Sequence, residues 1–134
     1  MSTVIRPEVS KKNKYWISKH RYYELKHFCL QYNEWQDQLS SVRVDQQQSF
    51  SEAKTYGHGD PTVKRFMTKA WVNTNMVKDA AKEATDDMWM YIVLAVTSGL
   101  SYDKLAAYVE IPCCRDTFYE YYRKFFYFLD KKRD

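Results

Sequence analysis

The sequence predicts an all-α protein, a helical bundle of about five helices that ends in a trihelical arrangement with a helix-turn-helix. Its 134 residues include only 3 Gly and 3 Pro, too few for the turns that a sheet of hairpins requires. Apolar residues recur at spacings of three and four through most of the chain, which is the period of an amphipathic helix. Hydrophobic residues make up 45% of the chain and aromatic residues 17%, so a chain of this length can bury a real core.

Residues 1–14 are predicted to form a flexible basic arm, because they are polar and end in a run with three lysines. Residues 15–134 are expected to form a single all-helical domain. Ser18 is the predicted N-cap of its first helix, since a serine hydroxyl accepts a hydrogen bond from a free N–H group of the first turn. The apolar stripe of this helix contains Tyr22, Leu25, Phe28, Cys29 and Tyr32, and it extends through Trp35 and Leu39 if the helix continues.

A polar linker is predicted near residues 40–59, where the helical period disappears and Ser, Gln and Gly accumulate. Asp60 and Pro61 then predict a helix start, with an acceptor at the cap and proline at the first helical position. This helix should run to about Lys82. Its wide apolar face predicts contacts on two sides.

Thr85, Asp86 and Asp87 predict the start of the next helix, because carboxylates are favourable at a helix N-terminus. The segment from Met88 to Val96 is apolar nearly all round, so we expect it at the centre of the core. Gly99 is predicted to end this helix as a left-handed C-cap.

The helix-turn-helix is predicted at residues 101–129. Ser101 is the expected N-cap of its first helix. Pro112 disfavours helical geometry at the preceding residue, so this helix should stop by about Glu110 and leave Ile111 as the buried plug of the turn.

The second helix of the motif is expected to start near Cys114 and to have two different faces. The apolar face contains Cys114, Phe118, Tyr121, Phe125 and Phe128, spaced alternately four and three. The opposite face contains Arg115, Asp116, Tyr119, Tyr122 and Arg123. In helix-turn-helix proteins the start of the second helix contacts base edges, while nearby basic and hydroxyl groups contact phosphates. The candidate nucleic-acid-binding residues are therefore Arg115, Thr117, Tyr119, Tyr122, Arg123 and Lys124.

Charge and motifs narrow the classes of function. The net charge of +4 and the pI near 8.9 are compatible with nucleic acid as a partner. The acidic residues Asp116 and Glu120 oppose that reading, because carboxylates repel phosphates. The aromatic face is equally typical of a protein interface.

The sequence does not support an enzyme, a zinc or disulfide-bonded protein, or a membrane protein. No phosphate-binding loop, metalloprotease motif or nucleophile elbow is present, so we expect no enzyme, no catalytic residues and no cofactor. Three cysteines without CxxC spacing favour neither a disulfide framework nor a zinc site, and they are typical of a cytoplasmic protein. No run of about 18 apolar residues predicts a membrane span.

The segments DPTVKRFMTKA at 60–70 and SGLSYDKLAAYVEIPCCRDTFYEYYRKFFYFLDKKR at 98–133 carry a resemblance. They are similar to phage-encoded late transcription regulators of the RinA and ArpU type, whose C-terminal part looks like region 4 of a sigma factor. The matching residues of the final motif are Ile111, Pro112, Arg115, Thr117, Phe118 and Tyr119. Glu110 stands where that pattern has the glycine of the turn. The resemblance covers the C-terminal half and implies a phage or prophage protein that binds DNA in the cytoplasm of a bacterial host.

Three hypotheses follow. The first is a non-enzymatic transcription regulator that binds double-stranded DNA through residues 101–129, with the N-terminal helix bracing the core or forming a homodimer. The second is a phage inhibitor that binds a host protein, such as a nucleic-acid-handling or defence enzyme, in the manner of an anti-CRISPR protein. The third is a DNA-packaging adaptor.

Overall fold

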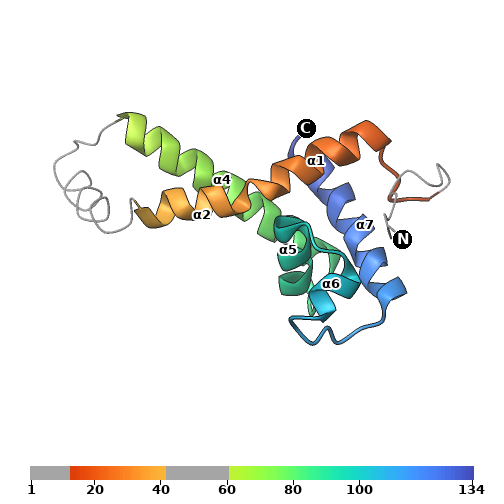
Figure 1. Ribbon diagram of the computed structural model, residues 1–134. Helices are drawn as coiled ribbons and strands as arrows, with labels where there is room; N and C mark the ends of the chain where they lie inside the picture. The colour runs from red at the N-terminus through yellow and green to blue at the C-terminus, as the bar shows by residue number, and fades with distance from the viewer. Residues whose placement is uncertain (1–12, 42–60) are drawn as a thin grey trace. The chain divides into compact units, whose positions relative to one another are not determined.

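The computed structural model describes residues 13–41 and 61–134, without the side chains of residues 41 and 61–67. The predicted all-α fold is confirmed, and no strand occurs in these two ranges (Figure 1). The helices are α1 (Lys19–Leu30), α2 (Tyr32–Ser41), α4 (Pro61–Ala84), α5 (Trp89–Ser98), α6 (Tyr102–Ala106) and α7 (Arg115–Lys132). Most of the predicted arm, most of the predicted linker and the Asp60 cap lie outside the described residues.

The chain divides into two compact units. The first comprises Met1–Leu30 and Met76–Asp134, and the second comprises Gln31–Asn75. Within the described part of the second unit, α2 and the first part of α4 share a buried polar contact. Gln36 Nε2 donates a hydrogen bond of 3.2 Å to Oγ1 of Thr74, whose side chain is buried. This bond satisfies a hydroxyl that would otherwise be costly to bury.

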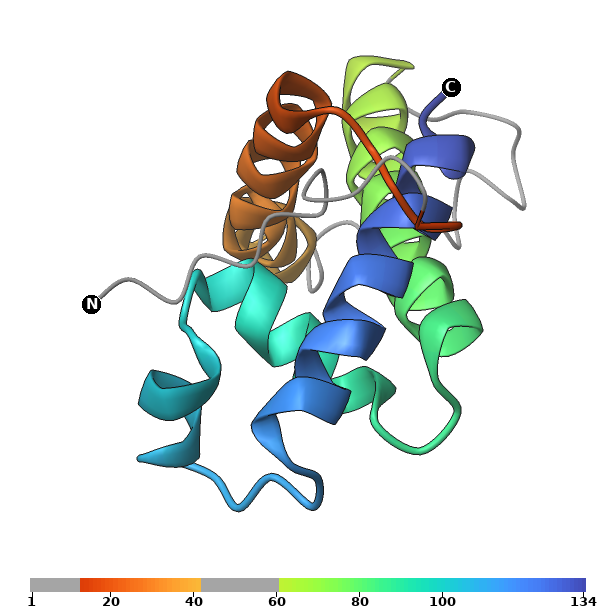
Figure 2. The same ribbon diagram turned by 90° about the vertical axis from the view of Figure 1, so that its right-hand side faces the viewer.

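The first unit contains the helices in which the function was predicted. Contacts join α1 to α5, and join α7 to α1, α5 and α6. Figure 2 shows α5, α6 and α7 following one another in this unit. Its largest fully buried side chains are Leu25, Cys29, Val77, Ile92, Phe118, Phe125, Phe126 and Leu129. Because three helices contact α7, this helix buries more than one narrow stripe.

The predicted helix ends of this unit are confirmed at three positions. Ser18 Oγ accepts a hydrogen bond from the N–H of Arg21 at 3.3 Å. Ser101 Oγ accepts one from the N–H of Lys104 at the same distance. Gly99 has a φ of 75° and donates its N–H to the carbonyl oxygen of Ala95, as a left-handed C-cap does.

Other boundaries differ from the sequence prediction. The long first helix is interrupted at Gln31, between α1 and α2. Helix α5 begins at Trp89 rather than at Thr85. Thr85 Oγ1 instead accepts the N–H of Met88 at 3.3 Å, in the turn before the helix. The expectation that α5 lies at the centre of the core holds for one side of the helix, where Ile92 and Val96 are buried, whereas Met90 is 60% exposed and Leu94 is 45% exposed on the other.

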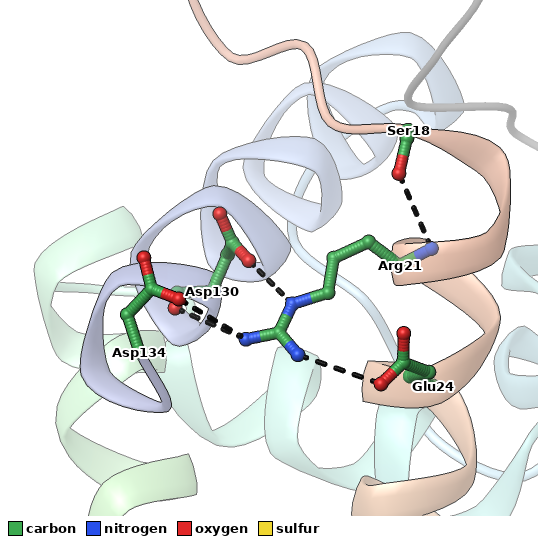
Figure 3. Close-up of polar contacts among 5 residues, drawn as sticks. All are labelled: Ser18, Arg21, Glu24, Asp130 and Asp134. Atoms are coloured by element: carbon green, nitrogen blue, oxygen red, sulfur yellow. Dashed lines mark hydrogen bonds and ion pairs between the residues drawn. The ribbon is translucent and has the colours of Figure 1, made fainter.

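Arg21 ties the start of α1 to the end of α7 (Figure 3). Its Nε donates to Asp130 Oδ1 at 2.6 Å, and its Nη2 donates to the carbonyl oxygen of Asp130 at 3.5 Å. Glu24 lies 3.6 Å from Arg21 Nη1, and Asp134 lies 4.0 Å from Nη2. The hydrogen bond with Asp130 is the main reason why the pKa of Arg21 is raised.

Candidate nucleic-acid interface

Helix α6 is shorter than predicted. It ends at Ala106, whereas Pro112 predicted an end near Glu110. The N–H groups of Ala107 and Tyr108 donate to the carbonyl oxygens of Lys104 and Leu105, three residues back. The helix therefore ends in a tighter turn of the 3₁₀ type, several residues before Pro112. The connection to α7 therefore spans residues 107–114, longer than the turn of three or four residues typical of this motif. Within it Ile111 is half-exposed and is not a buried plug.

The side chain and backbone of Tyr102 hold α6 against α7. The N–H of Tyr102 donates to the hydroxyl of Tyr119 at 3.0 Å. The hydroxyl of Tyr102 donates to the carbonyl oxygen of Cys113 at 2.6 Å. Its ring lies 5.3 Å from the ring of the fully buried Phe118. These three contacts fix the direction in which the first turn of α7 points.

The first turn of α7 is on the surface. The side chain of Arg115 is 45% exposed, and its Nη1 lies 3.9 Å from Asp103 Oδ2, whose side chain is 64% exposed. Asp116 is exposed, and Thr117 is half-buried with its hydroxyl 3.1 Å from Cys114 Sγ. Arg115 and Thr117 thus both lie in the first turn of α7, near the helix start that the sequence predicted.

The assignment of Tyr119 and Tyr122 to the DNA-contacting face needs correction. Tyr119 is only 5% exposed, and its hydroxyl accepts the hydrogen bond from Tyr102. The hydroxyl of Tyr122 lies 3.2 Å from that of Tyr22 on α1, and burial raises its pKa well above the ordinary tyrosine value. Both side chains point inward because α1 and α6 pack against a side of α7 that the spacing of apolar residues predicted to be exposed.

The remaining candidates lie further along α7. Arg123 and Lys124 are both half-exposed. Lys124 Nζ lies 5.5 Å from the ring centre of Tyr15 and 5.9 Å from that of Tyr121. Three residues of the predicted apolar face are not buried, since Tyr121 and Phe128 are half-exposed and Cys114 is exposed. The sequence did not predict that Tyr15 contacts Lys124. Tyr15 precedes α1, and the residues around it indicate no partner on α7.

Neither a metal site nor a membrane span emerges from the described ranges. No three His, Cys, Asp or Glu side chains in them gather closely enough to hold a metal ion. In the same residues no helix combines the length and apolar character needed to cross a membrane.

The three cysteines have different environments. Cys114 is exposed, and the Thr117 hydroxyl together with backbone N–H groups of the first turn lowers its pKa. Burial raises the pKa of Cys113 and, much more strongly, that of the fully buried Cys29. Only Cys114 is therefore both accessible and enriched in the reactive thiolate.

Iodoacetamide is expected to alkylate Cys114 first, Cys113 more slowly and Cys29 only after unfolding. A lowered pKa raises the thiolate fraction at neutral pH, and burial blocks access to the reagent. Mass spectrometry of peptides after timed labelling measures the order. Replacing Thr117 with valine removes the hydroxyl and should slow the labelling of Cys114 alone, whereas equal rates at Cys29 and Cys114 would contradict the described core.

Comparisons were made with protein families, curated proteins and solved structures. No family model, curated protein or solved structure matches this chain.

Proposed function

We propose that this chain is a non-enzymatic DNA-binding protein of phage or prophage origin. It binds duplex DNA through the first turn of α7 and regulates transcription in the cytoplasm of a bacterial host. The observation that carries the proposal is the exposed guanidinium of Arg115 at the start of a helix that Tyr102 and Phe118 hold firmly against α6. The resemblance of residues 98–133 to phage late transcription regulators supports the same reading.

Arg115 has the chemistry required to read a base. A guanidinium can donate two parallel hydrogen bonds to O6 and N7 of guanine in the major groove. Its ion pair with Asp103 is long and exposed on both sides, so it contributes little and DNA can displace it. Asp116, beside it, can accept a hydrogen bond from N4 of cytosine.

Arg123 and Lys124 supply positive charge further along α7, beyond the first turn that is proposed to contact the bases. In the described residues no carboxylate lies within ion-pair distance of either side chain. Both can therefore contact phosphates without losing an internal salt bridge. Such contacts contribute affinity that depends on salt and not on base sequence.

Fluorescence polarisation with labelled duplex DNA tests the proposal across a series of salt concentrations. The wild type should bind, and its affinity should fall steeply between about 50 and 200 mM salt because counterions are released. Replacing Arg115 and Arg123 together with alanine should weaken binding about tenfold or more, since a bidentate arginine contact contributes about 1–3 kcal/mol.

Replacing Lys78 and Lys82 of α4 with alanine removes the same net charge elsewhere and serves as the control. It should change affinity much less than the arginine pair does. If the wild type shows no affinity for duplex DNA at the lowest salt, the proposed function is wrong.

A second candidate function is binding to a host protein, such as a nucleic-acid-handling or defence enzyme. The exposed apolar side chains of Met90 and Leu94 favour it. They are four residues apart and therefore neighbours on the surface of α5. Capture of one host protein from lysate by the wild type, lost on replacing Met90 and Leu94 with serine, would support this second function.

A further inference from the structure

Beyond its first turn, one side of α7 carries lysines together with aromatic rings. Thr117, Lys124 and Lys131 follow one another at intervals of seven residues, or two helical turns, so they form one line along the helix about 10 Å apart. Tyr15 lies across this side, with its ring 5.2 Å from that of Tyr127. We call the surface formed by Lys14, Tyr15, Tyr121, Lys124, Tyr127 and Lys131 the lysine–tyrosine face.

Aromatic rings hold the three ammonium groups of the lysine–tyrosine face. Lys14 Nζ lies 5.6 Å from the ring centre of Tyr15, where Lys124 also approaches, and Lys131 Nζ lies 4.7 Å from that of Tyr127. These are cation–π distances. A lysine that already rests on a ring loses less side-chain freedom when it binds an anion.

The lysine–tyrosine face has unbalanced positive charge. None of the carboxylates that the structure describes lies within 4.0 Å of the Nζ of Lys14, Lys124 or Lys131. Glu120 lies one turn before Lys124 on the same side of α7, and it forms no ion pair with a described cation. The complementary partner is a polyanion with charges repeated along its length.

The length of α7 indicates where that polyanion runs. Its 18 residues extend over about 27 Å, whereas the major groove is about 12 Å wide. A helix that points its first turn into the groove, and does not lie along it, therefore extends past the groove and over the adjacent backbone. The C-terminal end of a recognition helix makes such backbone contacts in known motifs.

We infer that the lysine–tyrosine face binds the phosphodiester backbone of the DNA whose bases the first turn of α7 contacts. The inference rests on the proposed function and adds a second site to it. Lys124 and Lys131 contact successive phosphates along one strand, and Lys14 contacts the same strand from the segment before α1. Tyr15, Tyr121 and Tyr127 keep the ammonium groups in place. This site contributes binding affinity that is independent of base sequence.

Salt titrations of the full chain with a labelled duplex of mixed sequence test this inference. Replacing Lys124 and Lys131 together with glutamine should make the slope of log affinity against log salt shallower by about 1.8, because each lost phosphate contact removes about 0.9. Both substitutions remove surface ammonium groups and no core atoms, so the variant should fold; circular dichroism verifies this.

Lys82 supplies a matched control, because its Nζ also lies 4.7 Å from a ring centre, that of Trp89 on α5. Replacing Lys131 alone should lower the slope by about 0.9, while replacing Lys82 with glutamine should leave it unchanged. Replacing Tyr127 with leucine keeps every charge, so it should weaken binding without changing the slope.

Two contrary results have different meanings. If the wild type does not bind the duplex at low salt, both the proposed function and this inference fail. If it binds, and the variant at Lys124 and Lys131 has the slope of the Lys82 control, the lysine–tyrosine face is not the backbone site and Lys124 contacts no phosphate, while DNA binding through Arg115 and Arg123 still stands.

Discussion

Replacing Phe118 with alanine is expected to lower the free energy of unfolding by about 3–5 kcal/mol. The side chain is fully buried, and its ring lies 5.3 Å from that of Tyr102 and 5.5 Å from that of Tyr119. Its removal leaves a cavity where α6 meets α7, and neighbouring rings can fill such a cavity only in part. Urea denaturation followed by circular dichroism measures the change.

Two further substitutions make this result specific. Replacing Phe118 with leucine retains most of the volume and should cost less than about 1.5 kcal/mol. Replacing Tyr108, which is 79% exposed, with alanine should stay within about 0.5 kcal/mol of the wild type. A loss below about 1 kcal/mol for the alanine variant at Phe118 would contradict its place in the core.

Replacing Asp130 with alanine should lower the free energy of unfolding by about 1–2 kcal/mol, since hydrogen bonds to charged groups contribute about that much when they are partly shielded from water. The side chains of Arg21 and Asp130 are 26% and 29% exposed. The substitution leaves the guanidinium of Arg21 without its shortest partner at the junction of α1 and α7 (Figure 3). Thermal and urea unfolding both measure the effect.

Glu24 provides the matched control for Asp130. It is another carboxylate partner of Arg21, but its side chain is 68% exposed and the pair distance is 3.6 Å. Its replacement by alanine should therefore change stability by less than about 0.5 kcal/mol. Equal losses at Asp130 and Glu24 would show that burial does not strengthen the first pair.

Local side-chain chemistry made several parts of the fold predictable. A hydroxyl at Ser18 or Ser101 meets free N–H groups wherever a helix starts, so both caps could be read from the sequence. Gly99 could be assigned because the left-handed conformation at a helix end strongly favours glycine. These features depend on residues a few positions apart and on no distant partner.

Features that depend on distant partners were not predictable in the same way. The inward orientation of Tyr119, which is buried, and of Tyr122, which is half-buried, accompanies hydroxyl contacts with Tyr102 and Tyr22, which lie 17 and 100 residues away in the chain. The interruption at Gln31 follows no glycine or proline, so no local signal marks it.

In the candidate site, too, the features set by nearby residues could be predicted and those set by distant residues could not. The place of Arg115 and Thr117 at the start of α7 could be predicted because it depends on the nearby Pro112. Lys124 could be predicted as a cation of α7, but its contact with Tyr15 across the chain could not. The sequence of α7 is aromatic almost all round, and the period alone therefore does not distinguish its buried sides from its exposed one.

The most direct test of the central claim, that the first turn of α7 reads DNA, is selection of bound duplexes from a random pool. The wild type should enrich one sequence that contains a guanine. The protein with Arg115 replaced by alanine should still bind DNA but lose the preference for that guanine, which corresponds to about 1–3 kcal/mol of discrimination. No enrichment by the wild type, or the same preference in both proteins, would contradict the account.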